Sequence, residues 1–266
     1  MSVPRGSGLY KLPTESRFFD LSDYARPLAT RFVAFLLPYH FIGSITVTLS
    51  YAVVGLVSAG LIWHGQWMVL AALLLPVKSF LDAADGSLAR ARNRPSQVGR
   101  FLDSFCDFLV NLAVFTAIAH HAGQSMGYAL AALLLATFQG SVYNYYYVIR
   151  RHAADGDLTS IVDQRERPEG YPWDHPGILK FLHGAYLAIY WWQDRLAYYL
   201  DPKAVDCGGR LSGGFLTALS VLGLGFQLLM ICLFLLAGEI DWVLFYFTVP
   251  SMVYTLGLVA YRRFVL

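Results

Sequence analysis

Four aspartates in two closely spaced pairs are the residues of this sequence best suited to chemistry. Asp82 and Asp85 lie at positions i and i+3, and Asp103 and Asp107 at positions i and i+4. On a helix, residues at these spacings share a face, so each pair directs its carboxylates the same way. Carboxylates brought this close repel one another unless cations lie between them. Oxygen ligands without His or Cys suit Mg²⁺, Mn²⁺ or Ca²⁺, and four are enough for two ions.

The residues between the two pairs suit a phosphate site. Gly86 follows Asp85, Ala89 keeps the next turn small, and Arg90 is one turn beyond Gly86. Gly99 opens the stretch that carries the second pair. Small residues let a ligand approach the backbone, and the planar guanidinium of Arg90 can bind a phosphate or a base edge. Two metal ions on a pyrophosphate would stabilise the attacking and leaving oxygens of an in-line displacement.

The composition indicates that these acids belong to a membrane protein. The 266 residues are 56% hydrophobic and only 14% charged, and the mean hydropathy is +0.48, which is too apolar for an ordinary soluble enzyme. The formal net charge of +2 is too small for a groove that follows a nucleic-acid backbone, so we expect no nucleic-acid partner. Three cysteines at unrelated spacings form neither a disulfide nor a zinc pattern.

Apolar stretches predict an all-α fold with six transmembrane helices. Five stretches are long enough to cross a hydrocarbon core of about 30 Å. The sixth, 66–81, is shorter, but its helix can continue toward the first aspartate pair. The predicted spans are 41–63, 66–81, 99–120, 126–149, 213–237 and 240–261.

The distribution of Lys and Arg predicts how the spans are oriented. If there are six spans and both termini are on one side, the connections on the other side lie near His64, near 121–124 and near Gly238, and none contains Lys or Arg. Cytoplasmic loops retain Lys and Arg, so all 20 basic residues would lie at the cytoplasmic side. We expect a multi-pass protein with cytoplasmic termini and a cytoplasmic acidic cluster.

Two further amphipathic helices are expected outside the spans. Near the N-terminus, Ser22 or Asp23 can cap a helix that lies on the membrane surface or, alternatively, is the start of the first span. Its apolar face would comprise Leu28, Phe32, Phe35 and Leu36. The stretch 178–200, within a polar cytoplasmic loop at 150–212, is too interrupted by charge to span. The chain thus divides into a tail with an interfacial helix, 1–38, and a six-helix catalytic domain, 39–266.

The small residues and acids together resemble a known family signature. Asp82-x2-Asp85-Gly86-x2-Ala89-Arg90-x8-Gly99-x3-Asp103-x3-Asp107 is similar to the motif of the CDP-alcohol phosphotransferases, integral membrane enzymes of phospholipid synthesis. The resemblance implies that an acceptor alcohol attacks the outer phosphorus of a CDP-linked donor and releases CMP. The donor would be CDP-diacylglycerol or a small CDP-alcohol. The acceptor stays open between inositol phosphate, glycerol phosphate, serine and diacylglycerol, because no motif chooses among them.

The same resemblance implies roles for individual residues. Two Mg²⁺ or Mn²⁺ ions would be held by Asp82, Asp85, Asp103 and Asp107. Asp107 would also be the catalytic general base. The CDP site would be lined by Gly86, Ala89, Arg90 and Gly99, with Thr46 of the first span as a further contact. Many members of the family are dimers, so a homodimer is compatible with the resemblance.

Two positions depart from the family pattern. Gly43 stands where the family usually has an Asn three residues before the span threonine. Lys78, one turn before Asp82, is not expected in the family. An ammonium at that position would partly neutralise the acids.

Some interpretations stay open at the level of the sequence. The carboxylates could instead form the ion pathway of a cation- or proton-coupled transporter, or the chain could be an inert interaction scaffold. Clustering at one membrane face and the lack of duplicated halves argue against a transporter. Around the inner end of the fourth span, the polar and aromatic residues either face an acceptor pocket or, as we favour, form an interfacial belt and an interhelical hydrogen bond. These residues are Gln139, Asn144, Tyr143, Tyr145, Tyr146 and Tyr147.

Overall fold

The structure, a computed structural model, describes residues 10–156 and 163–265. Residues 1–9 of the predicted tail and residues 157–162 of the predicted cytoplasmic loop lie outside the described residues. Within the two described ranges every regular element is a helix, which confirms the all-α prediction.

The helices follow the predicted apolar stretches closely. The first five are α1 (Arg26–Leu36), α2 (Ser44–His64), α3 (Met68–Ala91), α4 (Gln97–His121) and α5 (Met126–Ala153). The later ones are α6 (Pro176–Tyr186), α7 (Trp192–Leu200), α8 (Gly213–Leu219), α9 (Leu224–Ala237), α10 (Val243–Thr248) and α11 (Pro250–Val265). Short 3₁₀ or π segments connect several of them: η1 (Thr14–Ser16), η2 (Leu187–Trp191), η3 (Pro202–Arg210), η4 (Ser220–Leu222) and η5 (Ile240–Trp242).

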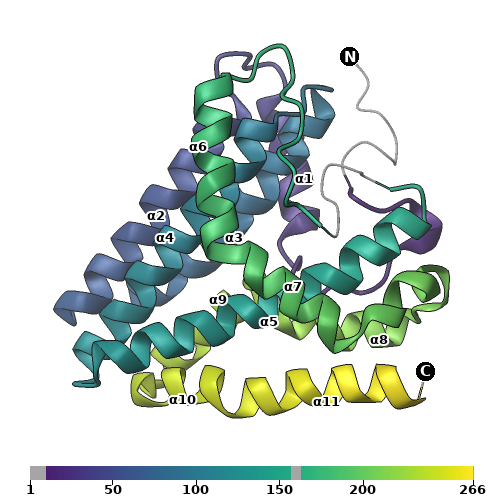
Figure 1. Cartoon of the computed structure of the whole chain (residues 1–266). Coiled ribbons are helices and arrows are strands. Elements are labelled where there is room, and N and C mark those ends of the chain that lie inside the picture. The colour runs from purple at the N-terminus through teal and green to yellow at the C-terminus, as the bar shows by residue number, and fades with distance from the viewer. Residues whose placement is uncertain (1–9, 157–162, 266) are drawn as a thin grey trace.

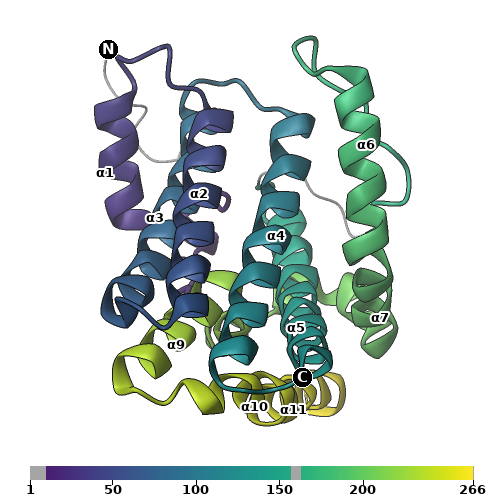
Figure 2. The same cartoon turned by 90° about the vertical axis from the view of Figure 1, so that its left-hand side faces the viewer.

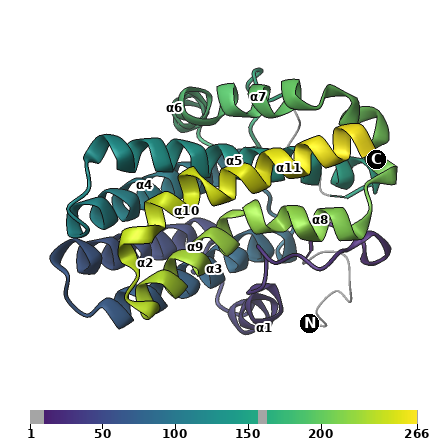
Figure 3. The ribbon, with the colours of Figure 1, turned by 90° about the horizontal axis from the view of Figure 1, so that it is seen from below.

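The helices form two groups that cross at an angle (Figure 1). Helices α1, α3, α2, α4 and α6 stand side by side in that order, each packed against the next (Figure 2). Helices α10 and α11 run along α5 (Figure 3). The largest hydrophobic core lies where α2, α3 and α4 meet α5, α9 and α10. The crossing leaves the other end of the first group farther from α5.

The three connections that contain no Lys or Arg gather at one end of the molecule (Figure 2). The α2–α3 turn begins at Gly65 in the left-handed conformation, φ +65°, which favours glycine. Next to this turn, Trp63 stacks on His120 with ring centroids 3.8 Å apart. In the other two connections, Gln124 Nε2 donates to the carbonyl of Asp241 at 2.9 Å. The arrangement fits loops that emerge on the same side of a membrane.

The chain is a polytopic membrane protein. Four helical stretches are long and apolar enough to cross a bilayer: Ser44–His64, Gln97–His121, Met126–Ala153 and Ile240–Val265. A fifth span results if the pair Gly213–Leu222 and Leu224–Ala237 is counted as one. Helix α3 does not qualify by composition, because Lys78, Asp82 and Asp85 interrupt its apolar stretch. The count of six spans therefore stays a prediction.

The predicted span 213–237 is not one straight helix. It bends by 54° at Gly223, where the chain that precedes α1 packs into the break. A Cβ at Gly223 would lie 2.3 Å from Ser22 Oγ, and one at Gly225 would lie 1.9 Å from the Ser22 carbonyl oxygen. Leu21 N also donates to Ser220 Oγ at 2.9 Å. The glycines allow a close approach that no local pattern in 213–237 indicates.

The predicted cap of the first amphipathic helix is wrong. Helix α1 begins at Arg26, and its N-cap, Ala25, provides no side-chain hydrogen bond. Asp23 instead pairs with Arg26 at 2.7 Å. Leu28 and Phe35 are 60% and 63% exposed, as a helix that lies on a membrane surface requires. The helix is separate from α2, which begins at Ser44.

The predicted helix 178–200 is present as α6, η2 and α7, with a π-helical segment in the middle. It begins slightly earlier than expected, at Pro176, because proline suits the first turn of a helix. Helix α6 packs along α4 through a small core that includes Phe101, Leu179 and Leu182. The helix thus closes one side of the space beside α4.

Candidate functional site

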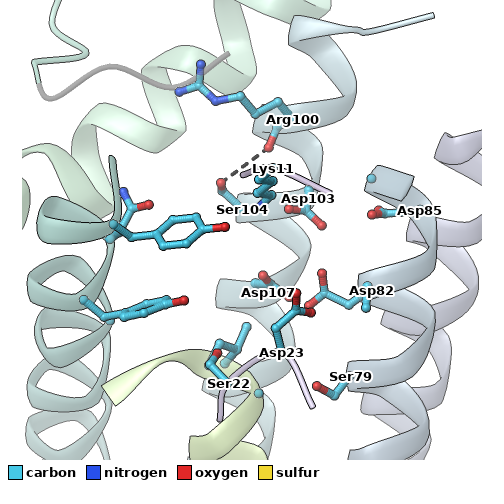
Figure 4. Close-up of a pocket in the computed structure, with 18 of the residues that line it drawn as sticks. Lys11, Ser22, Asp23, Ser79, Asp82, Asp85, Arg100, Asp103, Ser104 and Asp107 are labelled. Carbon is cyan, nitrogen blue, oxygen red and sulfur yellow. Dashed lines mark hydrogen bonds between the residues drawn. The ribbon is translucent and has the colours of Figure 1, made fainter. Parts of the chain in front are cut away.

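A cavity of about 430 Å³ lies between α3, α4 and α5 and the chain that precedes α1. Figure 4 shows the aspartates of α3 and α4 directed into the space between these helices. All the predicted signature positions line it: Asp82, Asp85, Gly86, Ala89, Arg90, Gly99, Asp103 and Asp107.

Helix α2 lies behind the aspartates and positions two of them. Helices α3 and α4 are consecutive in the chain, but each packs mainly along α2. Thr48 Oγ1 of α2 donates to Asp85 Oδ2 at 2.7 Å. The Tyr51 hydroxyl, one turn further along α2, donates to Asp103 Oδ1 at 2.7 Å. The separation of α3 from α4 leaves room for a ligand between the two pairs of acids.

Three of the four aspartates are close enough to share a metal ion. Each of Asp82, Asp85 and Asp103 offers a carboxylate oxygen within 4.8 Å of the others. The hydroxyls of Thr48 and Tyr51 that reach Asp85 and Asp103 are neutral, so they leave the carboxylate charges uncompensated. Asp85 is only 7% exposed, and a buried charge needs a partner. A hard divalent cation with oxygen ligands fits this group.

Asp107, the fourth predicted ligand, lies outside this group. Its Oδ1 accepts a hydrogen bond from Lys78 Nζ, and Lys78 Nζ also donates to Asp82 Oδ2 at 2.8 Å. Lys78 is 1% exposed. The prediction that Lys78 partly neutralises the acids is therefore confirmed, and the ammonium contacts one acid of each pair.

The end of α3 presents Arg90 to the cavity. A Cβ added at Gly86 would lie 3.4 Å from Arg90 Nη1, so the guanidinium lies back over the glycine one turn before it. The missing side chain leaves space at the Gly86 backbone next to the guanidinium. This is the arrangement that the sequence predicts for a phosphate or a base.

The start of α4 is held by an aspartate that the sequence analysis did not single out. Ser96 is the N-cap, and its Oγ accepts from Gly99 N at 2.8 Å. Asp174, from the chain before α6, accepts from Gln97 N at 2.8 Å and from the Ser96 hydroxyl at 2.5 Å. A carboxylate at a helix N-terminus also interacts favourably with the helix dipole. Asp174 therefore fixes the end of α4 from which Asp103 and Asp107 project.

Thr46 is not positioned as predicted for a CDP contact. Its side chain is exposed, whereas Ser44 and Thr48 line the cavity. Two residues along a helix correspond to about 200° of rotation. Thr46 therefore lies on a different face of α2 from Ser44 and Thr48, and the structure gives it no contact with a ligand in the cavity.

Some of the polar and aromatic residues near the end of α5 line the cavity, as the acceptor-pocket interpretation predicts, and others form contacts between helices. Those that line the cavity are Tyr143, Asn144 and Tyr147. Gln139 forms the interhelical hydrogen bonds: it donates to the carbonyl of Phe247 at 2.9 Å and accepts from Ser251 at 2.7 Å. Tyr145 and Tyr146 bond to Asp201. Only the first group can contact a ligand in the cavity.

The cationic residues of the cavity wall come from distant parts of the chain. They are Lys11, Arg26, Arg100 and Arg151. Arg26 donates to the Ala83 carbonyl at 2.7 Å and to Ser87 Oγ at 2.6 Å, which fixes the start of α1 on α3. Desolvation first, and then the guanidinium groups of Arg90, Arg26 and Arg151, lower the pKa of Lys11. No motif at one spacing links these residues.

Two acids at the edge of the cavity have shifted pKa values. Burial raises the pKa of Asp20 to about 6, although the Tyr143 hydroxyl donates to its Oδ2 at 2.6 Å. Burial likewise raises the pKa of Asp194 to about 6, with the Tyr186 hydroxyl donating to its Oδ2 at 2.6 Å. Both carboxyls lie outside the acidic group of α3 and α4.

Comparison with known families decides the class of the protein. The model of the CDP-alcohol phosphatidyltransferase family matches residues 35–158. Residues 35–158, just under half of this chain, resemble this family. The match covers α2 to α5 and includes every residue of the signature. It confirms the family resemblance and the prediction of an enzyme of this class.

Three curated proteins share shorter stretches with this chain. An archaetidylinositol phosphate synthase from Pyrococcus horikoshii is 46% identical over 54 residues, 20% of this chain and 29% of that protein. A phosphatidylinositol phosphate synthase from Cutibacterium acnes is 40% identical over 60 residues, 23% and 26% of the two chains. A bifunctional IPC transferase and DIPP synthase from Aquifex aeolicus is 31% identical over 103 residues, 36% and 24%. Each match spans only about a quarter of the relative's length.

Proposed function

We propose that the protein transfers a substituted phosphate from a CDP-linked donor to an acceptor alcohol and releases CMP. The observation that carries the proposal is the group formed by Asp82, Asp85 and Asp103, within 4.8 Å of one another, in the same cavity as Arg90. Carboxylates able to hold a cation thus share a cavity with a guanidinium suited to phosphate. This pairing serves a diphosphate substrate.

The residues divide the reaction between them. Asp82, Asp85 and Asp103 would hold a divalent ion, which would neutralise charge on the diphosphate. Gly86, Ala89, Arg90 and Gly99 would bind the CDP part. An acceptor oxygen bonds to the outer phosphorus, the bond from that phosphorus to the oxygen bridging to CMP breaks, and the acceptor proton passes to the Asp107 carboxylate.

We propose that the acceptor is itself a phosphorylated polyol, of the inositol phosphate class. Lys11, Arg100 and Arg151 line the cavity, and cationic groups there can bind a second phosphate. Two of the similar proteins are named as synthases of inositol phosphate lipids. The proposal distinguishes this acceptor from serine, glycerol phosphate and diacylglycerol.

An assay of donors and acceptors tests the reaction. Purified protein with Mg²⁺ is incubated with CDP-diacylglycerol or a small CDP-alcohol and each acceptor, and CMP and lipid products are identified by mass spectrometry. We expect CMP release that needs Mg²⁺ or Mn²⁺, stops with excess EDTA and is fastest with an inositol phosphate. The variant Asp85→Asn should be inactive, whereas Asp241→Asn, an exposed acid at the opposite end, should not be affected.

The outcomes separate the alternatives. Full turnover in EDTA would contradict the metal-dependent reaction. A lack of CMP release with every pair, together with ion uptake into proteoliposomes, would favour the transporter. Activity with serine or diacylglycerol and none with polyol phosphates would overturn the acceptor class alone.

We also propose that α3 is the sixth span and that both termini and the cavity are cytoplasmic. Helix α3 packs between α1, α2 and α9, so protein covers much of its charged part. A cysteine at Gln66, an exposed residue of the α2–α3 turn, should react with an impermeant thiol reagent added to intact cells, and Cys207 should not. Gly123, in the α4–α5 connection, is less suitable for the introduced cysteine, because its φ of +63° is strained for a residue with a side chain. The reverse labelling would invert the orientation.

A further inference from the structure

Lys78 occupies the place between Asp82 and Asp107 where a second metal ion would bind. Its Nζ donates to Asp82 Oδ2 at 2.8 Å and to Asp107 Oδ1. A divalent ion bridging these two carboxylates would lie between them, where the ammonium lies, at about 2.0–2.6 Å from an oxygen of each. The ammonium and such an ion cannot share that position.

The ammonium is held in place from a third side. Lys78 Nζ lies 4.4 Å from the centroid of the Tyr51 ring, an attractive arrangement for a cation. The hydroxyl of the same tyrosine donates to Asp103 Oδ1 at 2.7 Å, and Tyr51 is completely buried. Tyr51 therefore contacts the ammonium through its ring and Asp103 through its hydroxyl.

Displacement of the Lys78 ammonium from Asp82 and Asp107 would be energetically unfavourable. Lys78 is 1% exposed, and a buried ammonium without carboxylate partners is strongly destabilising. A metal ion that displaced Lys78 from Asp82 and Asp107 would leave a bare cation beside a divalent one. Within the described part of the chain, the Lys78 ammonium thus acts as the counter-ion of Asp82 and Asp107.

We propose that Lys78 replaces one of two divalent cations, so that the site binds a single ion at Asp82, Asp85 and Asp103. This inference rests on the proposed function and narrows it. Asp107 is then a base that Lys78 orients through Oδ1, and not a metal ligand. The family signature alone implies two ions, and the lysine one turn before Asp82 is the feature that departs from it.

The number of ions bound tests the inference without any measurement of activity. Purified protein in detergent is titrated with Mn²⁺, and free Mn²⁺ is followed by electron paramagnetic resonance. We expect one Mn²⁺ per chain. Two per chain would overturn the inference and leave the proposed function intact. No saturable binding would overturn the proposed function itself.

Two matched carboxylates on α4 provide a second test. Asp103→Asn should weaken Mn²⁺ binding by at least about tenfold, on the scale of perturbed metal sites. Asp107→Asn, one turn away on the same helix, should leave the Mn²⁺ affinity within about threefold of the parent, because Asp107 is not a ligand in this scheme. A threefold change corresponds to less than about 1 kcal/mol. Equal loss in both variants would show that Asp107 is a ligand and would overturn the inference.

Removal of the ammonium completes the test. Lys78→Met keeps an unbranched apolar side chain but frees Asp82 and Asp107, and we expect a second Mn²⁺ per chain. Lys180→Met, an exposed lysine of α6, should still bind one. A single ion in a folded Lys78→Met variant would show that the ammonium does not exclude the second ion. If that variant does not fold, the pair on α4 still decides.

Discussion

Two buried clusters in this protein combine a cation, carboxylates and tyrosines, yet they differ in charge balance. The acidic centre consists of Asp82, Asp85, Asp103 and Asp107 with Lys78. The Arg262 cluster consists of Arg262, Asp201, Tyr145 and Tyr146. In the second, Asp201 Oδ1 accepts from Arg262 Nη1 at 3.0 Å and Oδ2 accepts from the Tyr146 hydroxyl at 2.9 Å.

The difference separates a structural cluster from a functional one. The Arg262 cluster has one positive and one negative group, both at most 5% exposed, and it joins α5, α11 and the end of α7 away from the residues that line the cavity. The acidic centre has four carboxylates and one ammonium, and it opens on the cavity. A cluster balanced within the chain stabilises the fold, whereas an unbalanced one needs a ligand.

The largest effect is expected at Asp107. Asp107→Asn keeps the shape of the side chain but cannot accept the acceptor proton, so turnover should fall by about 10²- to 10⁴-fold. Donor binding should be retained, because Asp107 does not contact the CDP site in this scheme. Steady-state kinetics with a varied CDP donor separate the two parameters. Turnover within about tenfold of the parent would assign the base to another group.

Substitution in the Arg262 cluster should lower the stability of the fold and leave the metal site unchanged. Arg262→Met leaves Asp201 buried without its cation, which should cost about 3–5 kcal/mol. The midpoint of thermal unfolding in detergent should fall, while Mn²⁺ stoichiometry in the remaining folded protein stays unchanged. A loss of Mn²⁺ binding with unchanged stability would erase the distinction between the two clusters.

Arg90 should have a smaller, specific effect on donor binding. Arg90→Lys keeps the charge but loses the planar fork, so KM for the CDP donor should rise by about tenfold, the equivalent of one charged hydrogen bond. Arg167→Lys, at an exposed position, is the matched control. An unchanged donor KM in Arg90→Lys would show that charge alone suffices there.

The smallest effect concerns pH and Asp20, outside both clusters. Burial raises the pKa of Asp20 to about 6, so the protonated form is favoured in the folded state. Its stabilising contribution is present at low pH and is lost as the pH rises through about 6. Asp20→Asn removes this dependence and should be more stable than the parent by about 1 kcal/mol at pH 7.5, because the group is partly exposed. The difference in unfolding midpoint should shrink at pH 5, and a pH-independent difference would contradict the shift.

The local parts of the site could be predicted from the sequence. Spacings of three and four residues place the aspartates of each pair on one helix face, and the structure finds the whole signature on the cavity wall. The spacing could not tell how each helix is rotated against its neighbours. Thr46 is exposed, and Asp107 pairs with Lys78, because rotation and packing decide which side chains meet.

The sequence by itself determined the family resemblance of the signature, the helical class and the approximate bounds of the long helices, since motif spacing, apolar length and glycine or proline positions act within one segment. Only the tertiary structure decided that α2 separates α3 from α4, and that Ser22 packs into the break at Gly223. It also decided that Lys11 and Arg151 share the wall of one cavity. These contacts join residues far apart in the chain, and they depend on how helices pack, which no periodicity within a single helix records.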